Sequence, residues 1–141
     1  MECEFPTVNA DPKEMKDIFE KTKTIAIIGC SPDESKASNM VARYLKNAGF
    51  TIIPVYPKEE IILGEKVYRS LSEIPCKVDM VDIFRKPEVI ASVVDEAIAR
   101  GDIDIIWTQQ GLVNNAAAEK ALEHGMRVVQ NRCTKIEHQR L

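Results

Sequence analysis

Short apolar runs alternate with amphipathic stretches along most of the chain. Each run is too short for a core helix and too continuously apolar for a strand exposed on one face. The pattern therefore indicates strands buried on both faces, as in a parallel sheet. The predicted strands are residues 24–29, 50–55, 78–84, 103–109 and 126–130.

Signals for the start and end of helices lie between these runs. Asp11 as N-cap, Pro12 in the first turn and Glu14 as the capping-box acid predict a short amphipathic helix before the first strand. Three more helices are predicted. The first follows from the apolar spacing of Val41, Tyr44, Leu45 and Ala48 and ends at Gly49. The second begins at Pro87 and ends at Gly101, and the third has Asn114 as its N-cap and ends at Gly125. Residues 63–75 predict a loop with one helical turn capped by Ser70, and a polar tail ends the chain.

Strands that alternate with helices or crossovers predict right-handed βαβ units. The expected fold class is a doubly wound, three-layer α/β domain with helices on both faces of one five-stranded parallel sheet. Numbered by their appearance in the chain, the strands are expected in the order 3-2-1-4-5, and a flavodoxin-like 2-1-3-4-5 order is the alternative. Residues 1–21 are expected to form a helical extension packed on a single domain, residues 22–141.

Composition and charge narrow the class of protein. The 141 residues, 45% hydrophobic and 29% charged, suffice for one globular domain. A net charge of −3 argues against a nucleic-acid partner, because nucleic-acid binding usually needs a basic excess. No apolar run approaches the roughly 20 residues of a membrane helix. The acidic N-terminus has no signal-peptide pattern, so we expect a cytoplasmic protein.

The four cysteines, Cys3, Cys30, Cys76 and Cys133, stand far apart in the sequence. They form no CxxC pair, and no histidine lies at ligand spacing, which argues against a zinc site. In a reducing compartment we expect free thiols, some of them buried.

In a doubly wound sheet, ligands bind outside the carboxyl ends of the strands, at the crevice where the winding reverses. This rule selects candidate residues without reference to any family. The residues that follow the five predicted strands are Gly29, Cys30 and Ser31; Tyr56, Pro57 and Lys58; Phe84 and Arg85; Gln109, Gln110 and Gly111; and Asn131, Arg132 and Cys133.

The first of these loops, "GCSPDES", has the features of a phosphate cradle. Gly29 permits a tight turn of the backbone. The hydroxyls of Ser31, Ser35 and Ser38 are hydrogen-bond donors, and the free N–H groups at the start of the following helix attract an anion. The alternative is a tight turn without a ligand, because the second and third glycines of the dinucleotide fingerprint are absent.

The second and third loops each bring a cation. The tip of the second strand reads "VYPK" and lacks the acid that an NAD site needs for the ribose diol. Lys58 suits a phosphate on the ribose instead, and the alternative is an ordinary exposed lysine. Arg85 is placed to clamp a phosphate or to lie against a base, and the alternative is a pair with Asp82 or Glu88. Phe84 suits a stacking partner or a core aromatic equally well.

The sequence shows no catalytic constellation. His124 lies in the last turn of a predicted helix and His138 in the tail, so neither is expected at a strand end. The carboxylates around the strands fall within or before them; these are Asp79, Asp82, Asp102 and Asp104. Binding without catalysis is therefore the expectation from the residues.

Several motifs together resemble a known family. They are "IAIIGCSPDESKASNMVARYLKNAGFTIIPVYPK", "LGEKVYRSLSEIP", "VDMVDIFRKPE", "IWTQQG", "NRC" and the closing "IEHQRL", which run from about residue 22 to the C-terminus. On these residues the chain resembles the small stand-alone CoA-binding domain proteins of bacteria and archaea, which are similar to the N-terminal CoA-binding domain of the succinyl-CoA synthetase α subunit. The resemblance implies a single Rossmann-like domain that binds coenzyme A.

The resemblance also implies roles for individual residues. The expected cofactor-binding residues are Gly29, Cys30 and Ser31 at the pyrophosphate; Pro54, Tyr56, Pro57 and Lys58 at the adenosine and ribose 3′-phosphate; Phe84 and Arg85 at the nucleotide or pyrophosphate; and Gln109 beside the pantetheine. Ser35 is added to this set for its hydroxyl in the first loop and not from the resemblance. Tyr56 is a departure, since relatives commonly have asparagine there. The synthetase's other domains have no counterpart, so the resemblance implies binding and not ligase activity.

The function expected is therefore that of a coenzyme A or acyl-CoA binding protein, acting as a sensor or an accessory subunit. The alternative is an NAD(P)-binding oxidoreductase-like domain. A third interpretation, an acyl-CoA-processing enzyme with Cys133 as nucleophile, lacks an evident base. Cys133 also carries the hypothesis of a mixed disulfide with the coenzyme, against the simpler interpretation of a small residue in a structural turn. No membrane partner is expected, and a homodimer or an unknown protein partner is left open.

Overall fold

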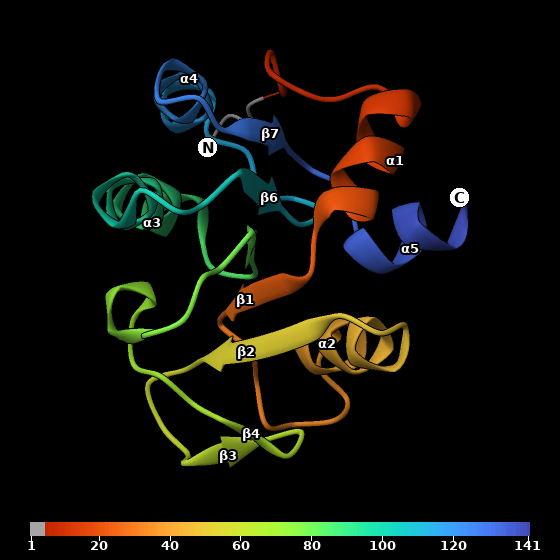
Figure 1. Ribbon diagram of the computed structural model, residues 1–141, viewed down its shortest axis with the longest axis vertical. Coiled ribbons are helices and arrows are strands. Elements are labelled where there is room, and N and C mark those ends of the chain that lie inside the picture. The colour runs from red at the N-terminus through yellow and green to blue at the C-terminus, as the bar shows by residue number, and fades with distance from the viewer. Residues whose placement is uncertain (1–4) are drawn as a thin grey trace.

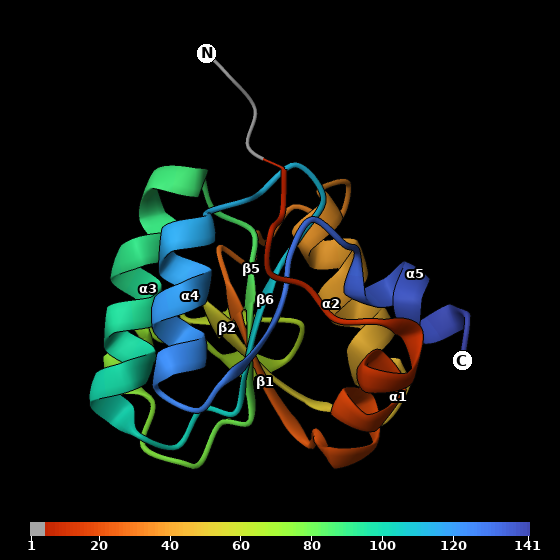
Figure 2. The ribbon, with the colours of Figure 1, turned by 90° about the horizontal axis from the view of Figure 1, so that it is seen from above.

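The computed structural model describes residues 5–141, which form a three-layer α/β fold with helices on both faces of a parallel sheet (Figures 1 and 2). Within these residues the sheet has five strands in the order β2-β1-β5-β6-β7, all paired in parallel. The strands are β1 (Thr24–Ile28), β2 (Thr51–Val55), β5 (Met80–Ile83), β6 (Ile105–Thr108) and β7 (Arg127–Val129). The predicted strands and fold class are confirmed.

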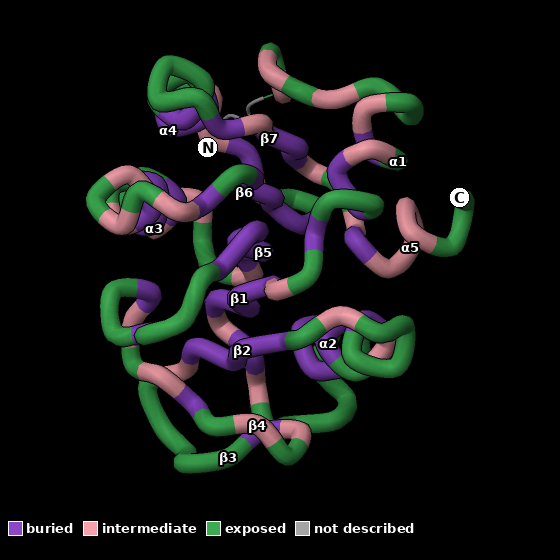
Figure 3. Tube along the Cα trace, viewed as in Figure 1, coloured by how far each residue is buried: buried purple, intermediate pink, exposed green. Residues whose placement is uncertain are grey.

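Helices cover both faces of the sheet (Figure 2). One face carries α1 (Pro12–Lys21), α2 (Ala37–Asn47) and α5 (Thr134–Gln139). The other carries α3 (Pro87–Arg100), α4 (Asn115–Glu123) and the 3₁₀ helix η1 (Leu71–Glu73). A small antiparallel hairpin of β3 (Ile61–Ile62) and β4 (Glu65–Lys66) lies beside β2 (Figure 1). Each face of the sheet therefore has its own apolar core, and the strands between the two are buried (Figure 3).

The predicted strand order 3-2-1-4-5 is wrong, and the alternative order 2-1-3-4-5 is the one observed. The third long strand of the chain, β5, pairs with β1 and not with β2. The outer edge of β2 is occupied by Tyr68, whose N–H donates to the carbonyl oxygen of Pro54 and whose carbonyl oxygen accepts from the N–H of Tyr56, both at 3.0 Å. Pro54 has no N–H for a neighbouring strand, which suits an edge position.

The helix starts and ends expected from the sequence are confirmed. Asp11 accepts a hydrogen bond from the N–H of Glu14 at 2.8 Å, and Asn114 accepts one from the N–H of Ala117 at 3.0 Å. Gly101 ends α3 in the left-handed conformation, with φ +78°. Local capping chemistry thus placed these helices correctly.

Two segments differ from the expectation. Ser70 directly precedes η1, but its side chain makes no capping hydrogen bond. The polar tail contains α5, which packs against α1 and α2 through His138. The His138 ring centroid lies 5.2 Å from that of Phe19, and its Nδ1 is 2.7 Å from the Tyr44 hydroxyl. This six-residue helix has no apolar stripe, and only its tertiary contacts explain where it lies.

The segment before β1 is part of the packed structure. Met15, Ile18 and Phe19 of α1 are buried in the same apolar cluster as Ile25 and Trp107. The expected division of the chain after residue 21 stays a prediction. Within residues 5–141, no helix has the length and apolar character needed to cross a membrane.

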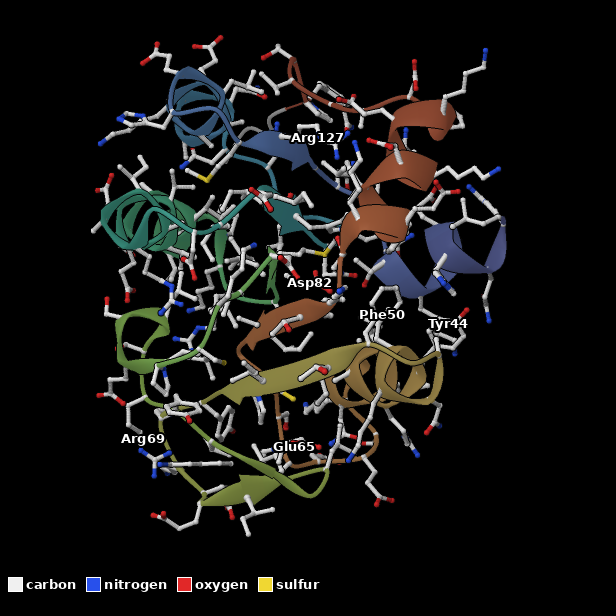
Figure 4. All side chains as sticks on the ribbon, in the orientation of Figure 1. Tyr44, Phe50, Glu65, Arg69, Asp82 and Arg127 are labelled. Atoms are coloured by element: carbon white, nitrogen blue, oxygen red, sulfur yellow. The ribbon has the colours of Figure 1, made fainter. Side chains whose placement is uncertain are left out.

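One carboxyl group lies in the middle of the sheet. Asp82 of β5 is fully buried inside the molecule (Figure 4). Its Oδ1 accepts a hydrogen bond from Nε2 of Gln109, and its Oδ2 accepts one from Oγ1 of Thr134 at 2.8 Å. Burial raises the pKa of Asp82 from 3.8 to about 7, because desolvation of the carboxylate outweighs these two hydrogen bonds.

The substitution Asp82→Asn should remove a pH dependence of stability. The pKa of Asp82 is higher in the folded than in the unfolded protein, so the free energy of unfolding of the wild type should fall as pH rises from about 4 to about 7, by at most about 1.4 kcal/mol per pH unit, and then level off. Urea unfolding at about pH 5 and about pH 8 measures this fall. An equal fall in the D82N variant would contradict the assignment to Asp82.

Candidate functional site

Two pockets open at the carboxyl edge of the sheet, one on each face. The first, named here the α3-side pocket, has a volume of about 250 Å³; its lining includes Gly29, Tyr56, Pro57, Arg69, Arg85 and Glu96. The second, the α2-side pocket, has a volume of about 300 Å³; its lining includes Ala37, Val41, Phe84, Gln109, Leu112 and Cys133. The winding of the sheet reverses between β1 and β5, so both pockets lie where a doubly wound sheet binds its ligand.

The end of β1 and the end of β5 meet between the two pockets. Gly29 adopts φ +86°, and a Cβ atom there would lie 2.8 Å from Cδ of Arg85, so only glycine allows this close approach. Phe84 and Arg85 are consecutive and line opposite pockets, as alternation along an extended chain requires. The predicted residues Gly29, Phe84 and Arg85 are thus brought together.

The Arg85 side chain is available for a ligand. It is exposed, and no carboxylate of the described residues forms an ion pair with it. The alternative of a pair with Asp82 or Glu88 is therefore wrong. Asp82 is buried and hydrogen bonded to Gln109 and Thr134 instead.

Most hydrogen-bond donors of the first loop are used internally. The N–H groups of Gly29 and Cys30 both donate to the carbonyl oxygen of Val55, at 2.9 and 3.3 Å. The hydroxyl of Ser35 donates to Oδ1 of Asp33 at 2.7 Å, and this hydrogen bond lowers the pKa of Asp33. A phosphate bound here needs other donors.

Two hydroxyls of the first loop keep their protons free for a ligand. Oγ of Ser38 accepts from the N–H of Ser31 at 3.0 Å, and Oγ of Ser31 accepts from the N–H of Asp33 at 3.0 Å. Because both oxygens act as acceptors in these hydrogen bonds, each O–H remains able to donate. Asn39 steadies the loop further, since its Nδ2 donates to the carbonyl oxygen of Ser31 at 2.9 Å.

The three cysteines of the described residues have different surroundings. Cys30 is fully buried, and desolvation, with the nearby Asp82, raises the pKa of its thiol to about 12, so its side chain faces the core and not a ligand. Cys76 is exposed before β5, at the opposite edge of the sheet. Cys133 is half-buried and lines the α2-side pocket. Cys3 lies outside the described residues.

The second loop is held by an arginine that the sequence analysis did not select. Nη1 of Arg69 donates to the carbonyl oxygens of Tyr56, Lys58 and Glu59 at 3.0, 2.8 and 2.8 Å (Figure 4). Its Nη2 lies 3.4 Å from Oε1 of Glu60. Arg69 stands within the quoted motif "LGEKVYRSLSEIP", which was the one signal for it.

The remaining predicted residues divide between the pockets and their surroundings. Tyr56 and Pro57 line the α3-side pocket, and Gln109 lines the α2-side pocket. Lys58 is exposed beside Pro57 and lines neither pocket. Pro54 is buried within β2, opposite Ile27 of β1, and lines neither pocket.

The two pockets differ in chemistry. The α3-side pocket is lined by the guanidinium groups of Arg69 and Arg85 and by one carboxylate, Glu96, whose Oε2 already accepts from the hydroxyl of Ser72 at 2.7 Å. An anionic group fits beside these cations. The α2-side pocket is lined by apolar side chains, two amides and the thiol of Cys133, and none of its lining side chains is a basic or acidic residue. Such a lining fits a neutral ligand arm.

Comparison with known proteins supplies the family. Residues 23–139 match the model of the CoA binding domain. A protein of Bacillus subtilis (strain 168), "Uncharacterized protein YneT", is 37% identical over 130 residues, which are 92% of this chain and 96% of that protein. The α subunit of "Acetate--CoA ligase [ADP-forming] II" of Pyrococcus furiosus is 29% identical over 132 residues, and the match covers 86% of this chain but 29% of that subunit.

The fold is also found among solved structures. A "hypothetical protein from Pyrococcus horikoshii OT3" superposes with a TM-score of 0.91 at 38% identity, over 100% of this chain and 99% of that one. A structure entitled "The structure of cell-free ID.343 from Thermus thermophilus" has a TM-score of 0.84 at 34% identity, over 93% and 98% of the two chains. Because the family model matches most of the chain, and a relative of similar length is 37% identical over 92% of it, the protein belongs to the CoA binding domain family.

Proposed function

We propose that the protein binds coenzyme A at the carboxyl edge of the sheet, with the phosphates near Gly29 and the pantetheine arm in the α2-side pocket. The single observation that carries this proposal is the packing of the Arg85 side chain against Gly29, which places this arginine at the first turn, in the lining of the α3-side pocket, with no ion pair to any carboxylate of residues 5–141. A ligand with an anionic end and a long neutral arm matches these surroundings. Membership of the CoA binding domain family supports coenzyme A as that ligand.

Donors for the phosphates come from the start of α2. The N–H groups of Ala37, Ser38 and Asn39 find no acceptor among the described residues, and the N-cap Lys36 makes no side-chain capping bond. The positive end of the helix dipole faces the same loop, and the hydroxyls of Ser31 and Ser38 add donors to it. Arg85 and Lys58 add the positive charge that a ligand with three phosphates needs.

No observation favours the alternative of an NAD(P)-binding domain. A ribose diol needs a carboxylate at the tip of β2. The first acids after that tip along the chain are Glu59 and Glu60, which follow Pro57 and Lys58, and Glu60 forms an ion pair with Arg69. We therefore propose a binding role, as a sensor of coenzyme A or as a subunit that presents it to a partner.

Isothermal titration with coenzyme A, NAD and NADP tests the proposal. We expect coenzyme A to bind most tightly. The variant Arg85→Ala should bind it about 10-fold more weakly, because it loses a charge-assisted contact with a phosphate. Lys58→Ala should weaken binding less, because Lys58 follows Pro57 of the α3-side pocket but does not line either pocket itself. Lys86→Ala is the matched control, since Lys86 is exposed next to Arg85 and lines neither pocket. Equal affinity for the three nucleotides, or an R85A variant that binds like K86A, would reject the proposed site.

The mixed-disulfide hypothesis makes a separate prediction. The thiolate of Cys133 attacks one sulfur of coenzyme A disulfide, the S–S bond breaks, and one coenzyme A leaves as its thiolate. Intact mass under non-reducing conditions, in a variant with Cys3→Ser and Cys76→Ser, should then show one coenzyme A adduct, and none when Cys133→Ser is added to that variant. The reactive thiol is expected to be Cys133, because Cys30 is buried with a raised pKa and Cys76 is at the opposite edge. An adduct that persists when Cys133→Ser is added refutes the hypothesis.

A further inference from the structure

The amide of Gln109 is held in one orientation by two groups below the α2-side pocket. Nε2 of Gln109 donates one hydrogen to Oδ1 of Asp82 and the other to Oγ1 of Thr134 at 3.0 Å. Oγ1 of Thr134 in turn donates its single proton to Oδ2 of Asp82 at 2.8 Å. Both hydrogens of the amide nitrogen are therefore used, and the amide has no donor left for a ligand.

The carbonyl oxygen of the same amide has no partner. Gln109 is 6% exposed and lines the α2-side pocket, yet no hydrogen bond to its Oε1 is formed within residues 5–141. Among these residues, the one side-chain oxygen that is sealed from solvent without a partner is Oδ1 of Asn39. Oε1 of Gln109 is thus reachable from the pocket and able to accept a hydrogen bond there.

We propose that Asp82 is a positioning residue: it orients the Gln109 amide so that its oxygen Oε1 faces the α2-side pocket as a hydrogen-bond acceptor. This acceptor selects a ligand arm that carries an amide N–H where the arm passes Gln109. This inference rests on the proposed function, because the pantetheine arm of coenzyme A carries two secondary amides. An arm with only acceptors, such as an ester or an ether, leaves Oε1 of Gln109 desolvated and unpaired.

The orientation depends on a carboxylate. An ionised aspartate only accepts, so it requires the nitrogen side of the Gln109 amide to face it. An asparagine of nearly the same shape both donates and accepts, and it is satisfied by either orientation of Gln109. The groups that face Asp82 from the elements packed around it are the thiol of Cys30, the amide of Gln109 and the hydroxyl of Thr134, with no cation among the described residues. The hydroxyl of Thr134 can donate or accept, and it accepts from Gln109 because its own proton is donated to Asp82, so the carboxylate sets the polarity of the amide.

The experiment compares coenzyme A with adenosine 3′,5′-bisphosphate, which has no pantetheine arm, at about pH 8.5, where Asp82 is mostly ionised. Affinities are measured by titration calorimetry for the wild type, Asp82→Asn, Gln109→Met and the double variant. We expect Q109M to bind coenzyme A about 3- to 10-fold more weakly, since it loses one hydrogen bond to the arm. We expect D82N to bind coenzyme A about 2-fold more weakly, since only about half of its Gln109 amides then face the pocket with the oxygen. Both variants should bind the bisphosphate as the wild type does. The double variant should be no weaker than Q109M, because Asp82 acts through Gln109.

Other outcomes overturn the inference in distinguishable ways. If D82N binds coenzyme A like the wild type while Q109M does not, Asp82 does not position the amide. If D82N weakens both ligands equally, its role is structural. If Q109M binds coenzyme A like the wild type while R85A does not, the proposed function stands and the acceptor is wrong. If the wild type binds neither ligand, the proposed function fails as well.

Discussion

The pairing of β1 with β5 is the constraint on which the candidate site depends. The register sets Ile28 opposite Ile83, and the N–H of Phe84 donates to the carbonyl oxygen of Ile28 at 2.9 Å. The two strands therefore end side by side, and Arg85 packs on Gly29. In the other strand order β5 would lie two strands away from β1, about 10 Å, and Arg85 would not reach the first turn. The topology thus creates the junction of the two pockets.

A buried carboxyl group in the same strand links this junction to the rest of the molecule. Asp82 carries a pKa raised to about 7 because it is desolvated without a cation beside it in the described structure. Its partners come from the end of β6 and the start of α5, so three elements meet at one polar network inside an apolar core. A desolvated carboxyl group in an apolar core destabilises the fold locally, and such a feature is expected where a protein orients side chains for a ligand. The network stands directly beneath the α2-side pocket and leaves one oriented oxygen there.

The sequence predicted the elements better than their arrangement. The caps at Asp11 and Asn114 and the stop at Gly101 were read correctly, because capping depends on residues within one turn of the chain. The strand order was misjudged although a signal was present: Pro54 lies in the middle of the second run, and proline within a strand favours an edge. Of the candidate residues, Gly29, Tyr56, Pro57, Phe84, Arg85 and Gln109 do line the two pockets, whereas Pro54 and the thiol of Cys30 are buried.

By itself the sequence determined the five strands of the sheet and the helices α1 to α4, but not α5 or the β3–β4 hairpin. It also determined which strand ends carry the chemistry, and that this chemistry is cationic and without a histidine at the strand ends. These properties follow from neighbours along the chain. Only the tertiary structure decided which hydrogen-bond donors of the first loop have an acceptor within the protein. It also decided that Arg69 donates to the backbone of the second loop, and that Asp82 and Thr134 orient the amide of Gln109. The contacts of Arg69 with Lys58 and of Asp82 with Gln109 and Thr134 join residues that are 11 to 52 positions apart, and packing rather than local conformation sets their distances.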